Sequence, residues 1–231
     1  LQRELERQLS RVERLGDAGE RVREGTATVA DIFRIKAMMH ASYSVARSLT
    51  AAGVVRPCSR LPLDERQLGT ALRLLNPEPE RRARFVLSDR FSDALALARE
   101  TAASCESQSS AAREAAASAL EEKYGVRIRA GKVTVAAQNA HALDDAAELR
   151  LDASTGFERV YTPVWPDELR ALMHATDRAN ELVRTQEAAV LQQLCAQLEP
   201  SVARFAELQT WLGTVDFGLA RVRLAQRFGG W

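Results

Sequence analysis

Histidine is the side chain that most often binds metals or moves protons near neutral pH, and this chain of 231 residues has only three. They are His40, His141 and His174, and none has a second histidine at the spacing of a metal-binding pair. The three cysteines are also far apart, so there is no Cys-x-x-Cys pair and no even set for a disulfide framework. We therefore expect no metal centre, and a reducing compartment is the default.

The segment from Gly125 to Val133 superficially resembles a phosphate-binding loop. Five residues separate its two glycines where such a loop has four. Val133 follows Lys132 at the position where serine or threonine would bind magnesium. A Gly-x-Ser-x-Gly hydrolase elbow is also absent from the sequence. We predict that the segment is a turn between strands and that this chain is not an enzyme.

Basic residues between positions 125 and 166 are the remaining candidates for ligand contact. The basic and acidic residues of this segment nearly cancel, whereas phosphate binding needs an excess of cations on one surface. On a β-strand Arg127 and Arg129 would share a face, which leaves open a local basic patch. The alternative is an ordinary solvated sheet.

The whole-chain composition favours helices and does not point to nucleic acid. The chain has 32 basic and 31 acidic residues, and only 12 glycines and 7 prolines. Few forced breaks and abundant alanine, leucine, arginine and glutamate suit long helices. No signal peptide and no apolar run of membrane-spanning length is found, so we expect no membrane association.

Two long uninterrupted segments should position the basic cluster. One runs from Ser88 to Gly125 without proline or glycine, and the other lies between Pro166 and Pro200. Between them apolar and polar residues alternate, as they do in strands. We predict a mainly α fold, with a helical core, two long antiparallel helices and a small β-rich tip between them. The chain begins inside a helical pattern and ends without a tail, so we expect a piece of a longer protein.

A family resemblance enters with residues 157–164, which read FERVYTPV and precede a long helix. They resemble the clamp-to-lever junction of the MutS family of DNA mismatch-recognition proteins, which typically reads like ERYFTPEL. Residues 181–200 resemble the descending lever of that family. Residues 211–225 resemble its closing core helix, where Leu-Asp-hydrophobic precedes Leu-Ala; these positions are Val215, Asp216, Leu219 and Ala220.

The first half of the chain is similar to the same family. Residues 5–12 resemble a core-helix motif around Leu-Glu-Arg-Leu-Leu, and residues 31–49 resemble the next core helix. Residues 86–100 are similar to the start of the ascending lever. The resemblance therefore covers nearly the whole chain, in the family's order.

The resemblance implies five segments. They are a helical core (1–87), an ascending lever helix (88–124), a β-rich clamp (125–166), a descending lever helix (167–200) and a closing core helix (201–231). In this family paired subunits close around duplex DNA, and core and levers link an ATPase domain to clamps that touch the DNA backbone. The implied partners are double-stranded DNA and a MutS-type subunit, in a homodimer or heterodimer.

The catalytic part of such a protein would lie outside this chain. An ATPase domain that binds ATP and magnesium would follow Trp231, so no cofactor is expected here. The expected location is intracellular and DNA-associated, in the nucleus of a eukaryote or the cytoplasm of a bacterium. Our candidate DNA-backbone contacts are Arg127, Arg129, Lys132, Arg150, Thr155 and Arg159.

The sequence also departs from the family pattern. Asp152 and Thr155 stand where basic residues are common, and residues 132–137 replace a Gly-Tyr-Tyr-type strand. These departures weaken the expected affinity of the clamp for DNA. The alternative hypothesis is a helical scaffold or protein-interaction module, without catalysis, that has lost DNA binding.

Overall fold

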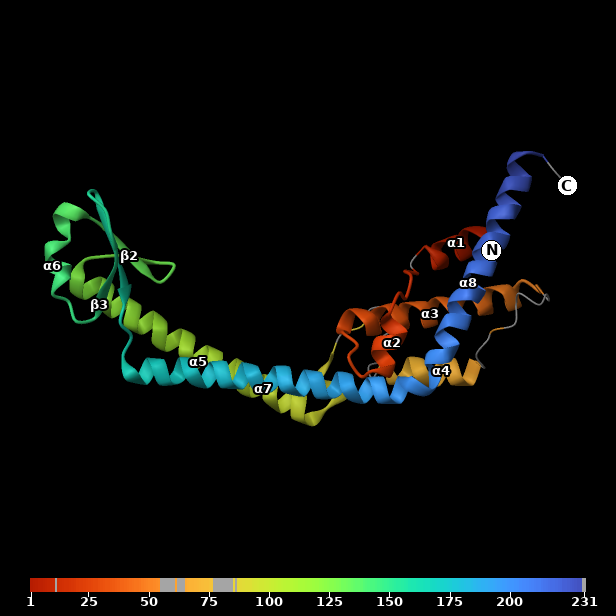
Figure 1. Cartoon of the computed structure of the whole chain (residues 1–231), viewed down its shortest axis with the longest axis horizontal. Coiled ribbons are helices and arrows are strands. Elements are labelled where there is room, and N and C mark those ends of the chain that lie inside the picture. Colours follow the sequence, from red (N-terminus) through yellow and green to blue (C-terminus); the bar gives the residue numbers. More distant parts are fainter. Residues whose placement is uncertain (11, 55–60, 62–64, 77–84, 86, 230–231) are drawn as a thin grey trace. The chain divides into compact units, whose positions relative to one another are not determined.

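The computed structural model describes residues 1–10, 12–54, 61, 65–76, 85 and 87–229. It is mainly helical with one small antiparallel sheet, as predicted (Figure 1). Contacts divide the chain into two compact units, which are described separately. The first unit comprises residues 1–93 and 186–231, and the second comprises residues 94–185.

Where the structure describes the first unit, its regular elements are all helices. They are α1 (Gln2–Leu9), α2 (Ala18–Arg23), α3 (Val29–Ala51), α4 (Glu65–Leu74), the last part of α7 (Asp167–Leu198) and α8 (Val202–Arg227). Two short 3-10 helices adjoin the long ones: η2 (Asp89–Phe91) precedes α5 (Asp93–Tyr124), and η4 (Glu199–Ser201) lies between α7 and α8. Helix α2 was not predicted, because its few residues between glycines show no clear apolar period.

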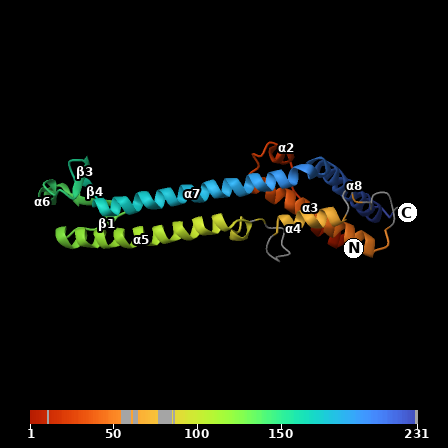
Figure 2. The ribbon, with the colours of Figure 1, turned by 90° about the horizontal axis from the view of Figure 1, so that it is seen from below.

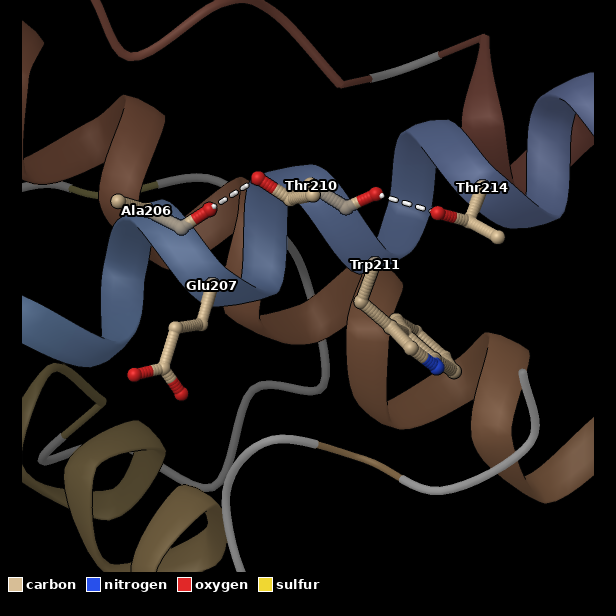
Figure 3. Close-up of a pocket in the computed structure, with 5 residues that line it drawn as sticks. All are labelled: Ala206, Glu207, Thr210, Trp211 and Thr214. Carbon is tan, nitrogen blue, oxygen red and sulfur yellow. Dashed lines mark hydrogen bonds between the residues drawn. The ribbon is translucent and has the colours of Figure 1, made fainter. Parts of the chain in front are cut away.

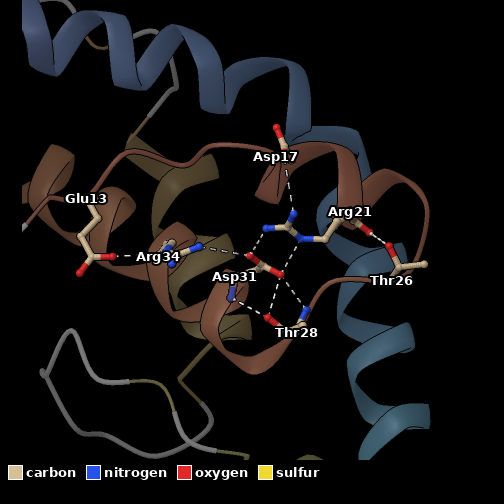
Figure 4. Close-up of polar contacts among 7 residues, drawn as sticks. All are labelled: Glu13, Asp17, Arg21, Thr26, Thr28, Asp31 and Arg34. Atoms are coloured by element: carbon tan, nitrogen blue, oxygen red, sulfur yellow. Dashed lines mark hydrogen bonds and ion pairs between the residues drawn. The ribbon is translucent and has the colours of Figure 1, made fainter.

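The first turn of α3 is fixed by a polar cluster around Asp31 (Figure 4). The Thr28 hydroxyl accepts a hydrogen bond from the Asp31 backbone, and the Asp31 carboxylate accepts one from the Thr28 backbone, which completes a capping box. Arg21 donates two hydrogen bonds to the same carboxylate, at 2.5 and 2.9 Å. Thr28 is therefore the N-cap of α3.

Helix α8 buries one face against other helices of the first unit, among them α1, α2 and α3. Phe205, Leu208, Leu212 and Val215 are buried, and they recur at the spacing of one helical face. The same spacing continues through Leu219 to Val222, but Val222 is 48% exposed. The apolar pattern of α8 therefore extends beyond the part of the helix that the described core covers.

The second unit contains most of α5 (Asp93–Tyr124) and the first part of α7, which lie side by side in both views (Figures 1 and 2). Helix α5 was expected to begin at Ser88 or Asp89. It begins later because Ser92 is extended, with φ −161° and ψ 128°, and separates it from η2. Small or apolar residues of α5 are buried at helical spacing: Leu95, Ala98, Ala102, Ser109 and Leu120.

Four strands form the sheet of this unit, in the order β1-β2-β4-β3. They are β1 (Ile128–Arg129), β2 (Lys132–Ala136), β3 (Leu149–Ser154) and β4 (Glu158–Pro163), and each neighbouring pair is antiparallel. The connection between β2 and β3 carries η3 (Ala137–Asn139) and α6 (His141–Asp144). Asp144 is the last residue of α6.

One face of the sheet packs on a small core. Val133 of β2 and Tyr161 of β4 are directly paired and almost fully buried. Ala140, Leu143 and Ala146 cover them from the β2–β3 connection. Side chains alternate between the two faces of a strand, so the neighbours of Val133 and Tyr161 point to the other face, which this core leaves open.

Candidate nucleic-acid interface

Three of the predicted cations share the open face of the sheet. Arg129 pairs with Lys132 across the β1–β2 turn, and Arg150 pairs with Thr162 across β3 and β4. Because Val133 pairs with Tyr161, Lys132 and Thr162 also lie on the same side. The result is a row across all four strands in the order Arg129, Lys132, Thr162, Arg150, which we call the cationic row.

Two arginines of the cationic row are available to a ligand. Arg129 and Arg150 are exposed, and neither forms an ion pair with any residue that the structure describes. Arg127 precedes β1 and is also exposed, again without an ion pair in the described part of the chain. An exposed guanidinium can donate to two phosphate oxygens at once. The chemistry of these three residues therefore suits contact with the phosphate backbone of a nucleic acid.

A carboxylate interrupts the cationic row. The pairing of β3 with β4 shifts between Leu151 and Ala153, so Asp152 is the extra residue of a β-bulge. Its Oδ2 lies 3.0 Å from Nζ of Lys132. This hydrogen bond, with the charges of Lys132 and Arg150, lowers the pKa of Asp152. Lys132 is therefore already paired in the free protein.

Arg159 lies on the opposite face. It is paired with Val135 of β2 and follows the alternation of Tyr161 toward the core. Its guanidinium forms an ion pair with Asp144, whose other oxygen accepts a hydrogen bond from the Tyr161 hydroxyl at 2.7 Å. Arg159 first and Tyr161 second lower the pKa of Asp144. The structure thus does not bring Arg159 together with the cationic row.

Thr155 stabilises the turn between β3 and β4. Its hydroxyl oxygen accepts hydrogen bonds from the backbone of Phe157 at 3.3 Å and of Glu158 at 3.0 Å. Its own backbone N–H donates to the Glu158 carbonyl at 2.8 Å. All of these contacts lie within the turn. The turn therefore accounts for a threonine at this position, and no contact to a ligand is needed to explain it.

Glu148 joins the end of α5 to the sheet and was not selected from the sequence. Its carboxylate accepts hydrogen bonds from Lys123 and, at 2.7 Å, from the Tyr124 hydroxyl. These bonds, Lys123 first, lower the pKa of Glu148 to about 2. Its backbone carbonyl accepts from Val164, which follows β4. No local pattern marks this residue, because its partners lie 16 to 25 positions away in sequence.

A second contact between α5 and the sheet uses Glu121. Its carboxylate accepts a hydrogen bond from the backbone N–H of Ile128 at 2.7 Å. The first residue of β1 is therefore held by the last turns of α5. Two polar contacts and the apolar core therefore join the end of α5 to the sheet.

Two hollows of the first unit offer little for chemistry. One, of about 470 Å³, follows a single face of α8 (Figure 3), where the hydroxyls of Thr210 and Thr214 donate to helix carbonyls. Its carboxylate, Glu207, is paired with Arg204 at 2.9 Å. The other, of about 720 Å³, is an open groove that includes Arg66 and Gln197.

Within the described ranges, no group of three or more His, Cys, Asp or Glu residues could hold a metal ion. No helix in those ranges is long and apolar enough to cross a membrane.

No family model matches the chain, and no curated protein matches it.

Proposed function

We propose that this chain is the core, lever and clamp part of a MutS-type protein and that it contacts the backbone of duplex DNA through the cationic row and Arg127. The observation that carries the proposal is the register that gathers Arg129, Lys132 and Arg150 on one open face. Phosphate contacts of this kind position DNA without reading its sequence. In this proposal the chain itself binds and transmits but does not catalyse.

The lever role is a further part of the proposal. Helices α5 and α7 each have 32 residues, which corresponds to about 48 Å at about 1.5 Å per residue. A rigid element of that length can carry a displacement at the sheet to a distant ATPase domain that binds ATP and magnesium. The polar contacts of Glu148 and Glu121 support the proposal, because they fix the end of α5 to the sheet.

A direct test is fluorescence anisotropy with labelled duplex DNA, at about 50 mM and about 200 mM salt. Phosphate contacts release counterions, so affinity should fall steeply as salt rises. The combined variant Arg127→Glu and Arg129→Glu should weaken binding and reduce the salt dependence by about one log unit per log unit of salt for each lost contact. The full-length protein with its partner should be tested in the same way.

The matched control changes the same charge elsewhere in the second unit. Arg113 of α5 and Arg178 of α7 are exposed and form no ion pair within the described ranges. Arg113→Glu with Arg178→Glu alters net charge equally but leaves the cationic row intact. Equal weakening of DNA binding by both double variants would show a nonspecific charge effect. If the full-length protein with its partner does not bind duplex DNA, the proposal is wrong.

A second function is favoured by the two ion pairs of the sheet. Asp152 neutralises Lys132, and Asp144 holds Arg159 on the core side. If these pairs persist, the second unit presents few free cations and serves as a scaffold or protein-interaction module. Absence of salt-dependent DNA binding, with an intact fold by circular dichroism, would favour this alternative.

A further inference from the structure

A carboxylate already lies at the centre of the cationic row in the free protein. Strand β4 stands between β2 and β3, and Asp152 of β3 reaches across it to Lys132 of β2. Within the row, Thr162 of β4 is the residue between Lys132 and Arg150. The Asp152 carboxylate therefore lies over β4 on the open face, among the side chains of the row.

Three groups of the row act on this carboxylate. The Lys132 ammonium donates a hydrogen bond to Oδ2 of Asp152. This bond is the largest of the causes that lower the pKa of Asp152, and the charge of Arg150 and the Thr162 hydroxyl contribute after it. An ammonium, a guanidinium and a hydroxyl can all donate hydrogen bonds. We call Lys132, Thr162 and Arg150 together the oxyanion site.

The group that fills the oxyanion site points to the class of ligand that the site accepts. A carboxylate has two oxygens and one negative charge. A phosphodiester of nucleic acid also has two unesterified oxygens and one negative charge, so it can accept the same hydrogen bonds. Lys132 and Arg150 carry two positive charges against the single charge of Asp152, so the site attracts an anion even while Asp152 fills it.

The β-bulge allows Asp152 to leave the oxyanion site at little cost. Asp152 is the extra residue of the bulge, and the extra residue of a bulge is left unpaired. Its side chain can turn away while the residues on either side, Leu151 and Ala153, keep their partners in β4. Exposed ion pairs contribute little to stability, so loss of the contact with Lys132 does not threaten the fold.

We propose that the oxyanion site binds a phosphoryl oxyanion in exchange for the carboxylate of Asp152, which fills the site when no ligand is present. The inference rests on the proposed function where that oxyanion is a phosphate of duplex DNA, and inorganic phosphate offers the same chemistry without DNA. An internal occupant lowers the apparent affinity of a ligand by the fraction of time for which the site is free. Asp152 therefore sets the ligand concentration at which the site fills.

Inorganic phosphate, titrated into the isotope-labelled whole chain at constant ionic strength, tests the exchange directly. The NMR signals of the Lys132 and Thr162 amides and of the Asp152 side-chain carboxyl carbon should shift together and saturate, because the ligand replaces the carboxylate. The side-chain carboxyl carbon of Glu148 should keep its position, since its partner Lys123 lies outside the oxyanion site.

Three single variants separate the groups of the oxyanion site. Asp152→Asn should tighten phosphate binding by about fivefold or more, because it removes the internal occupant and a repulsive charge. Arg150→Gln should weaken phosphate binding by about the same factor, because one of two cations is lost. Thr162→Val removes the hydroxyl but keeps the branched shape, and it should weaken phosphate binding by about threefold or more.

Two matched control variants lie in the same unit. Thr134→Val removes an exposed hydroxyl from the same face of β2, two residues beyond Lys132. Arg127→Gln removes an exposed cation that is not part of the oxyanion site. Both variants should leave the affinity for phosphate unchanged, whereas Arg127→Gln should still weaken the binding of duplex DNA. Amide spectra of each variant show whether it folds.

Duplex DNA, titrated in the same way, distinguishes this inference from the proposed function. If phosphate displaces Asp152 but the chain does not bind DNA, the oxyanion site stands and the proposed DNA contact is wrong. If DNA binds while the carboxyl signal of Asp152 stays in place, the cationic row contacts DNA without exchange and this inference is wrong. Equal phosphate affinity with and without Asp152→Asn would also overturn it.

Discussion

The ammonium of Lys132 lies 3.0 Å from the carboxylate of Asp152, two strands away on the open face of the sheet. Strand β4 lies between them, and the bulge at Asp152 makes the contact possible. The pair is exposed, with 56% of the Lys132 side chain and 40% of the Asp152 side chain accessible. Exposed pairs of this kind contribute little to stability, so the main effect of Asp152 is on the charge that the sheet presents.

Removing that carboxylate should strengthen DNA binding if the cationic row contacts phosphates. Asp152→Asn keeps the size and hydrogen-bonding capacity of the side chain but frees Lys132 and removes a repulsive charge. We expect affinity for duplex DNA at low salt to rise by about tenfold, with one more unit of salt dependence. Anisotropy titrations over a salt series measure both quantities.

The control for this prediction is Glu158→Gln. It removes the carboxylate of an exposed residue at the start of β4, in the same sheet. Glu158 forms no ion pair with a residue that the structure describes, so this change alters net charge without freeing a cation. Equal gains from Asp152→Asn and Glu158→Gln would mean that the Lys132 pair does not control binding.

The boundaries of α7 could be predicted because they are local signals. Helix α7 begins at Asp167, directly after Pro166, and ends at Leu198 before Glu199 and Pro200, as the sequence indicated. Proline lacks a backbone donor and restricts the residue before it, so these limits do not depend on the rest of the fold. The strands were also predicted, because alternation of apolar and polar residues is a local pattern.

The charge distribution of the sheet could not be predicted, because it depends on register. One extra residue at Asp152 decides which β3 side chains face Lys132. Arg159 was grouped with the other cations, yet the pairing of β4 directs it toward Asp144 in a four-residue helix that the sequence did not reveal. A shift of one residue reverses the faces of a strand, and no local pattern specifies it here.

The lowered pKa of Glu148 predicts a pH dependence of the second unit. A carboxyl group with a folded-state pKa of about 2, below its ordinary value of about 4.3, stabilises the fold above pH 4.3. That stabilisation is lost as pH falls from about 4 to about 2, because the protonated group no longer attracts Lys123. NMR titration of the side-chain carboxyl carbon should give the low value directly.

Two glutamate-to-glutamine variants separate this effect from general acid denaturation. Glu148→Gln should flatten the dependence of the melting temperature on pH between about 4 and about 2. Glu122→Gln, an exposed position at the end of α5 without an ion pair in the described residues, should leave it unchanged. The same slope in both variants would contradict the assignment.

Thr28 should contribute to the stability of the first unit through the N-terminus of α3. Thr28→Ala removes the hydroxyl that accepts from the Asp31 backbone at 3.3 Å and donates to its carboxylate at 2.8 Å. Loss of a capping side chain costs about 1 kcal/mol of unfolding free energy. Urea denaturation followed by circular dichroism measures it, and Thr28→Ser should retain most of the stability. A serine variant as unstable as the alanine variant would show that the methyl group, not the hydroxyl, matters.

The β1–β2 turn contains a residue that strains the backbone. Ala130 has φ 50° and Gly131 has φ 73°, the combination of a two-residue turn in which asparagine followed by glycine is preferred. Because alanine in this region costs about 1 to 2 kcal/mol relative to right-handed conformations, Ala130→Asn should stabilise the hairpin by about 0.5 to 1 kcal/mol. Slower hydrogen exchange of the Val133 amide and a higher urea midpoint would report the change.

Ala130→Val tests the same conformation from the other side. A β-branched side chain is disfavoured at positive φ, so this variant should speed exchange at Val133 and weaken the pairing of Arg129 with Lys132. If DNA binds through these two side chains, Ala130→Asn should also tighten binding modestly and Ala130→Val should loosen it, since a fixed turn lowers the entropy lost on association. Opposite changes in hydrogen exchange without any change in DNA affinity would place the DNA contact elsewhere.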